Sequence, residues 1–203
     1  IALLYKSNAL DVLSKQEELD NTINQGMNLA KDNNNTRFKS EFTAALAYRL
    51  ELKGDYLEAL NKANQALRYA NETNDDRLIA EQLSLRGQIQ LAIENFDLAL
   101  EDIVEASEIF KQNDDHYNLT LNYNIMAIIY NNMSDHDNAI KYYMESELHD
   151  AAKSPYNQAA LYYNLGSTYF DKKDFDQAVI NYEKSSQYSQ LNNDSYTLAY
   201  TQY

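Results

Sequence analysis

The chain of 203 residues has no cysteine and no tryptophan, a single proline and only four glycines. Without cysteine it can form neither a disulfide framework nor a thiolate zinc site. The absence of cysteine is compatible with both the bacterial periplasm and the cytoplasm. So little glycine and proline leaves few turns for an all-β fold. No apolar run approaches the roughly 18 residues that span a bilayer, so we expect no direct membrane insertion.

Acidic residues and helix formers dominate what is present. The net charge is −14 and 44% of the residues are hydrophobic, enough for a core. Nucleic-acid backbones require clustered lysine and arginine, so this charge argues against a nucleic-acid partner. Abundant Ala, Leu, Glu, Gln and Lys favour helices. The composition therefore predicts an all-α protein.

Four segments of the chain superpose without internal gaps, and successive copies lie 39 or 40 residues apart. One site in each copy is always small: Ala47, Gly87, Ala127 and Gly166. Twelve residues later stands an alanine: Ala59, Ala99, Ala139 and Ala178. Four residues before that alanine stands Asp or Asn: Asp55, Asn95, Asp135 and Asp174. Small residues let two helices approach closely and Asp or Asn caps a helix, so each copy is predicted to be a helical hairpin.

The last copy resembles a tetratricopeptide repeat. The residues that carry the resemblance are Tyr162, Leu165, Gly166, Tyr169, Ala178, Tyr182 and Ser185. The resemblance implies a right-handed superhelical α-α solenoid of about five hairpins, with the tyrosines in its core. Two features depart from the family pattern: the usual closing proline is absent, and the copies exceed the family's length of about 34 residues. The extra length predicts longer second helices or loops.

On this basis we expect a single array over residues 1–203. Residues 1–39 would form a degenerate hairpin, in which Ser14 and Glu17 read as a capping box, and Ser154 with Pro155 should open a later helix. The repeats would occupy residues 40–79, 80–119, 120–158 and 159–197, with the start of a further helix at 198–203. The array is expected to be a piece of a longer one, with self-association through its exposed terminal repeats.

The sequence offers no candidate catalytic, cofactor or metal site. None of His116, His136 and His149 has a metal-ligand partner three or four residues further along the chain, and no phosphate-binding glycine pattern is present. His136 stands where the other copies carry an aromatic ring, which favours packing over catalysis. We therefore expect no enzyme, no cofactor and no metal in this fragment.

Acidic residues recur at three- and four-residue spacing in the middle of the chain: Glu94, Asp97, Glu101, Glu105 and Glu108. This spacing predicts one helix face on the convex side. Two interpretations stay open, a solvated face and a docking surface for a basic partner.

The family binds peptides in a concave groove lined by the first helix of each hairpin. By repeat position the resemblance assigns to this groove Tyr48, Ser84, Gln88, Asn124, Ile128, Asn131, Tyr163, Asn164, Ser167 and Phe170. Glu41, Glu81, Leu121 and Ala160 stand where a clamp for a terminal carboxylate could carry lysine, so such a clamp is disfavoured. Amides and tyrosines suit a peptide backbone and apolar side chains instead.

The resemblance thus implies a non-enzymatic scaffold that binds a protein or peptide segment. Its long repeats are similar to those of sensory arrays in bacterial signalling proteins, such as diguanylate cyclases, histidine kinases and transcription regulators. The chain would then be the sensory or regulatory module of a larger protein, with any output enzyme outside this fragment. The alternative is a peptide-pheromone receptor or a regulator of the response-regulator phosphatase type.

Overall fold

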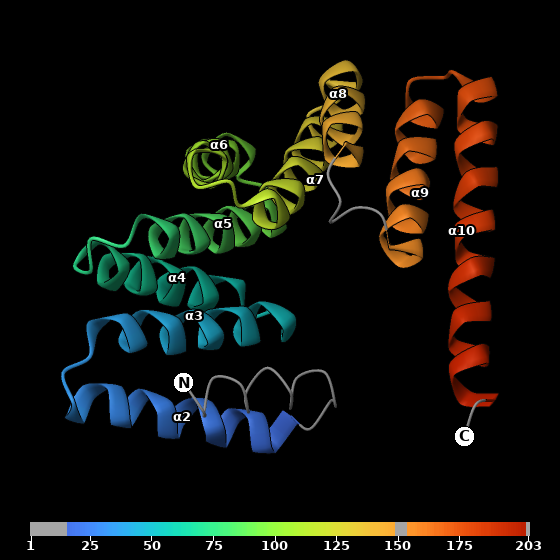
Figure 1. Cartoon of the computed structure of the whole chain (residues 1–203). Helices are drawn as coiled ribbons and strands as arrows, with labels where there is room; N and C mark the ends of the chain where they lie inside the picture. The colour runs from blue at the N-terminus through green and yellow to red at the C-terminus, as the bar shows by residue number, and fades with distance from the viewer. Residues whose placement is uncertain (1–15, 149–153, 202–203) are drawn as a thin grey trace. The chain divides into compact units, whose positions relative to one another are not determined.

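The structure is a computed structural model that describes residues 16–148 and 154–201 (Figure 1). All regular elements in these ranges are α-helices, which confirms the predicted all-α class. They are α2 (Gln16–Asp32), α3 (Thr36–Leu52), α4 (Tyr56–Asn71), α5 (Asp76–Ala92), α6 (Phe96–Gln112), α7 (His116–Asn132), α8 (His136–Glu147), α9 (Pro155–Asp171) and α10 (Phe175–Thr201). None of these helices is long and apolar enough to cross a membrane. Ser14, His149 and the first part of the predicted degenerate hairpin lie outside the described residues.

The chain divides into two compact units, residues 1–109 and 110–203. In the first unit, α2, α3, α4 and α5 pack side by side in chain order, and α3 also contacts α5, so first helices of successive hairpins are neighbours (Figure 1). In the second unit, α7 packs on α8, α8 on α9, and α9 on α10. Within each unit the predicted stacking of helical hairpins is confirmed.

Every described turn between helices contains a residue with positive φ. Six of them follow one another at intervals of 20 residues: Asn34, Gly54, Asn74, Glu94, Asp114 and Ser134. Lys173 takes the same conformation in the turn before α10. Each copy of about 40 residues is therefore a pair of helix-and-turn units. The helices α3 to α6 have 16 or 17 residues, and the length of these helices explains the length of the copies.

At Asp115, Asp135 and Asp174 the residue after the positive-φ residue has two functions. Its backbone N–H donates to a carbonyl five residues earlier, as in Asp115 to Phe110 at 2.9 Å and Asp174 to Tyr169 at 2.9 Å, which closes the preceding helix. Its side chain then accepts from the backbone N–H three residues later, so that Asp115 caps α7 and Asp174 caps α10. One residue thus ends one helix and begins the next.

The predicted caps are confirmed at Asp135, Asp174 and Ser154. Asp55 takes the N-cap position of α4, but its side chain makes no capping bond, so that prediction is wrong. Its ψ of 55° lies further from the extended region than the 72° of Asp135, which does bond. Asn35 and Asp75 cap first helices that the repeat frame left without a named cap.

The small residues lie where helices cross. A Cβ on Gly87 would stand 2.8 Å from Ile103 and 3.1 Å from the Ala99 carbonyl oxygen, and one on Gly166 would stand 2.7 Å from the Tyr182 ring. The alanines on the second helices are buried. Ser185 Oγ donates to the Ala159 carbonyl at 2.7 Å across the last hairpin. These contacts confirm the predicted close approach of paired helices.

Residues 198–201 continue α10, which runs without a break to Thr201, instead of opening the further helix predicted at 198–203. No proline or glycine follows Gly166 in the chain. Nothing in the local sequence therefore forces the helix to end after residue 190.

Enlarging a crossing residue should loosen the fold. Ala99 has no exposed surface and its carbonyl faces Gly87, so Ala99→Leu must displace the Gly87 helix. We expect it to lower the free energy of unfolding by about 1 to 3 kcal/mol in urea titrations. Glu101→Ala, on the exposed side of the same helix, should change it by less than about 0.5 kcal/mol. Equal effects of the two substitutions would contradict this assignment.

Candidate functional site

A cavity of about 190 Å³ lies between α7 and α9 in the second unit. We call it the α7–α9 cavity, and its lining residues are Tyr117, Thr120, Leu121, Asn124, Ser146, Asn157, Ala160, Leu161 and Asn164. Two of the predicted groove residues, Asn124 and Asn164, thus come together in one cavity. Thr120 and Ser146 are buried, whereas Tyr117 and Leu121 are exposed at its rim.

The two asparagines differ in how far their amides are used. Asn124 Nδ2 donates to the Thr120 carbonyl at 3.2 Å, and its Oδ1 accepts from Ser146 Oγ at 3.1 Å. The amide of Asn164 has no hydrogen-bond partner among the described residues, so its donor and its acceptor face the cavity region unused. No acidic or basic side chain lines this cavity. It therefore suits an uncharged group that brings its own hydrogen bond.

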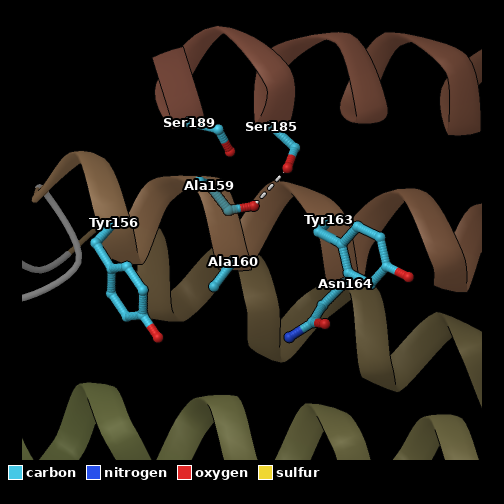
Figure 2. A pocket seen from close by; sticks show the side chains of 7 residues that line it. All are labelled: Tyr156, Ala159, Ala160, Tyr163, Asn164, Ser185 and Ser189. Atoms are coloured by element: carbon cyan, nitrogen blue, oxygen red, sulfur yellow. Dashed lines mark hydrogen bonds between the residues drawn. The ribbon is translucent and has the colours of Figure 1, made fainter. Parts of the chain in front are cut away.

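A second, more open depression of about 430 Å³ lies between α9 and α10. We call it the α9–α10 slot, lined by Tyr156, Ala159, Ala160, Tyr163, Asn164, Ser185 and Ser189. Figure 2 shows Tyr156, Ala160 and Asn164 projecting from one side of α9, while Ser185 and Ser189 point from α10 toward α9. Ala160 and Asn164 belong to both the slot and the α7–α9 cavity.

The other predicted groove residues of the second unit have mixed environments. Ile128 is partly buried and packs against the core cluster that contains Leu161 and Tyr162. Asn131 is engaged by the α7–α8 turn, since its Oδ1 lies 3.0 Å from His136 Nδ1. Ser167 is half-buried and Phe170 is exposed, with its ring 5.5 Å from that of Phe175.

Tyr48, Ser84 and Gln88 lie on α3 and α5, in the first unit. Gln88 Nε2 donates to Glu51 Oε1 at 3.2 Å, and Ser84 Oγ is buried without a partner among the described residues. Burial raises the pKa of Glu51, and the bond from Gln88 opposes that shift. None of these three residues lines the α7–α9 cavity or the α9–α10 slot, which both lie in the second unit.

Sequence reasoning missed Tyr117 and Tyr156. Tyr117 precedes Asn124 by seven residues and Tyr156 precedes Tyr163 by seven, so each pair shares a helix face. This seven-residue spacing is the sequence signal that could have identified the two tyrosines as lining residues. The resemblance assigned groove positions only from the middle of each first helix onward, whereas both tyrosines stand in the first turn.

The core of the second unit contains buried tyrosines, as predicted. Tyr143 and Tyr162 are buried in the cluster with Ala127, Ile140 and Leu165. Tyr162 donates to Glu147 Oε1 and stacks on Tyr188 with 5.5 Å between ring centroids. Burial raises the pKa of both buried phenols, and for Tyr162 the bond to Glu147 adds to it.

Histidine and carboxylate side chains outside the two cavities have varied surroundings. The described residues contain no group of histidine and carboxylate side chains that could hold a metal ion. The acidic residues Asp97, Glu101, Glu105 and Glu108 are exposed on α6, and Glu94 stands in the turn before it. Asp102 on the same helix is buried instead and binds the Arg86 guanidinium through both oxygens, at 2.7 and 2.5 Å.

A known family matches the second unit of the chain. Residues 117–190, which contain α7, α8, α9 and most of α10, match a family model described as tetratricopeptide repeat. These residues carry tetratricopeptide repeats. No curated protein matches the sequence of the chain.

Several solved structures share the fold of this chain. BtubC from P. vanneervenii is 17% identical with a TM-score of 0.78, over 92% of this chain and 78% of that one. Aspartyl phosphate phosphatase F from Bacillus subtilis is 13% identical with a TM-score of 0.78, over 95% of this chain and 51% of that one. The quorum sensor NprR from B. thuringiensis is 18% identical with a TM-score of 0.73, over 92% and 53%. At these identities the likeness shows the fold alone.

The buried phenol of Tyr143 should make the protein sensitive to alkali. Above about pH 10 the phenol ionises in the unfolded chain, whereas the folded protein holds the proton to higher pH. Stability should therefore fall as the pH rises past about 10. Tyr143→Phe should make this fall less steep in urea titrations at about pH 8 and about pH 11. Tyr117→Phe, with an exposed ring, is the control, and identical pH profiles for the two variants would refute the expectation.

Proposed function

We propose that this chain is a non-enzymatic scaffold whose α7–α9 cavity binds an extended, uncharged segment of a partner protein or peptide. The observation that carries the proposal is the cavity itself, with the unused amide of Asn164 inside and the exposed Tyr117 and Leu121 at its rim. An amide can donate to and accept from a peptide backbone, and the rim residues offer apolar contact area. Such a combination is typical of peptide recognition.

The absence of charge in the α7–α9 cavity defines the segment further. A ligand carboxylate or ammonium group would lose its hydration there without an opposite charge to compensate it. Leu121 and Ala160, both in this lining, stand where a carboxylate clamp would need lysine. The scaffold therefore favours an internal stretch of a chain, or a short neutral peptide, over a charged chain end.

We further propose that binding serves regulation, with the chain as the sensory or regulatory module of a larger bacterial signalling protein. The alternative is a regulator of the peptide-pheromone receptor or response-regulator phosphatase type. The fold likeness to a quorum sensor and to an aspartyl phosphate phosphatase supports this alternative. The chain spans about half the length of each of these two proteins, so any output step would need further domains.

Selection from a display library of random peptides tests the binding proposal. Enriched peptides, labelled with fluorescein, would be titrated with the whole chain and followed by anisotropy. We expect uncharged sequences, and we expect Asn164→Ala to weaken binding about tenfold, since a lost hydrogen bond and its reorganisation have this order of effect. Asn61→Ala is the matched control because Asn61 is an exposed asparagine on α4.

Two results would refute the proposal. One is the enrichment of acidic or basic peptides whose binding is indifferent to Asn164→Ala. The other is the absence of any enriched peptide while circular dichroism shows the chain folded. Retention of affinity by a selected peptide shortened to a few residues would favour the pheromone-receptor alternative over the scaffold for longer segments.

A further inference from the structure

Apolar side chains form much of the wall of the α7–α9 cavity. Leu161 is 4% exposed and belongs to a core cluster, while Leu121 and Ala160 lie nearer the surface, where both are exposed. Tyr117 and Asn157 are exposed in the first turns of α7 and α9, at the rim of the cavity. The inner part of the cavity therefore offers mainly van der Waals contact, and a group that fills it must be largely apolar.

The hydrogen-bonding capacity of the cavity is concentrated in one amide. Thr120 Oγ1 donates to the His116 carbonyl at 2.7 Å, and Ser146 Oγ donates to Asn124 Oδ1 at 3.1 Å. Thr120 and Ser146 are also 2% and 0% exposed, so their oxygens are shielded from an incoming group. Asn164, whose amide has no partner among the described residues, is only partly buried. It can therefore offer its N–H donors and its oxygen to a ligand.

The volume of the cavity limits what can fill it. An apolar protein cavity of about 150 Å³ holds a benzene ring. The α7–α9 cavity measures about 190 Å³, which leaves room for one ring with a small substituent. A serine or threonine side chain would leave most of this volume empty, and the walls would lose contacts there. The cavity thus has the size of one aromatic side chain.

The polar end of the occupant must match the Asn164 amide. A phenol hydroxyl is donor and acceptor in one atom, so it can donate to Oδ1 or accept from Nδ2. A phenylalanine or leucine side chain would cover the amide without pairing it, at the desolvation cost of an unsatisfied group. A glutamine side chain would bring a second N–H donor for which the apolar walls hold no acceptor. A charged side chain would find no opposite charge in the lining.

We infer that the α7–α9 cavity takes one tyrosine side chain of the bound segment, with its ring against the apolar walls and its hydroxyl bonded to the Asn164 amide. The inference rests on the proposed function, because it names the residue that anchors the extended segment. Tyrosine brings a large ring and one polar tip with few rotatable bonds, so little freedom is lost when it binds. The exposed ring of Tyr117 at the rim adds a second aromatic surface for it.

The probe is p-cresol, the side chain of tyrosine without its backbone, and toluene and propionamide represent phenylalanine and glutamine. Each is titrated into the ¹⁵N-labelled whole chain, and the backbone signals of Leu121 and Leu161 are followed by NMR. We expect p-cresol to bind about tenfold more tightly than toluene or propionamide, since one hydrogen bond in a desolvated site has this order of effect. Asn164→Ala should abolish the preference for p-cresol over toluene. Asn61→Ala, at an exposed asparagine on α4, is the matched control and should keep it.

Equal affinities for p-cresol and toluene, tighter binding of propionamide, or no saturable shift at Leu121 and Leu161 in the folded chain overturns the inference. So does a preference for p-cresol that survives Asn164→Ala.

The peptides enriched on the whole chain provide a second arm. Replacement of their tyrosine by phenylalanine should weaken binding to the unchanged chain about tenfold and leave binding to Asn164→Ala unchanged. Enriched peptides that depend on Asn164 and contain no tyrosine overturn the inference and leave the proposed function intact. Binding of p-cresol without any enriched peptide refutes the proposed function and assigns the cavity to a free phenol, which overturns the assignment to a tyrosine of a segment.

Discussion

The structure depends on a short turn in which one residue closes a helix and caps the next. At Asp115 and Asp174 the backbone N–H satisfies a carbonyl of the finished helix, while the carboxylate accepts from the helix that follows. The preceding residue must adopt positive φ, at Glu94, Ser134 and Lys173 without the freedom of glycine. Such a conformation costs roughly 1 to 2 kcal/mol, which a helix cap of comparable size offsets. The cap therefore compensates for the strain in the backbone. The turn also determines at which residue one helix ends and the next begins.

Regular turns determine which side chains meet. With turns at intervals of 20 residues, the small residue of each first helix comes opposite the second helix of its own hairpin, as Gly87 does with Ile103. The remaining faces of a first helix are then fixed by helical geometry. On α7, Tyr117, Leu121 and Asn124 share one side of the helix, and they are among the residues that line the α7–α9 cavity. The candidate site is thus a consequence of turn spacing.

The sequence predicted the parts of this arrangement that depend on local patterns. Crossing residues such as Gly87 and Gly166, and the cap at Asp135, are visible because a helix needs them wherever it lies. The state of each amide was not predictable, since Asn124 is engaged by Thr120 and Ser146 while Asn164 has no partner among the described residues. That difference arises from tertiary contacts. The exposure of Val179 was equally hidden, because its type matches that of the buried Ile140.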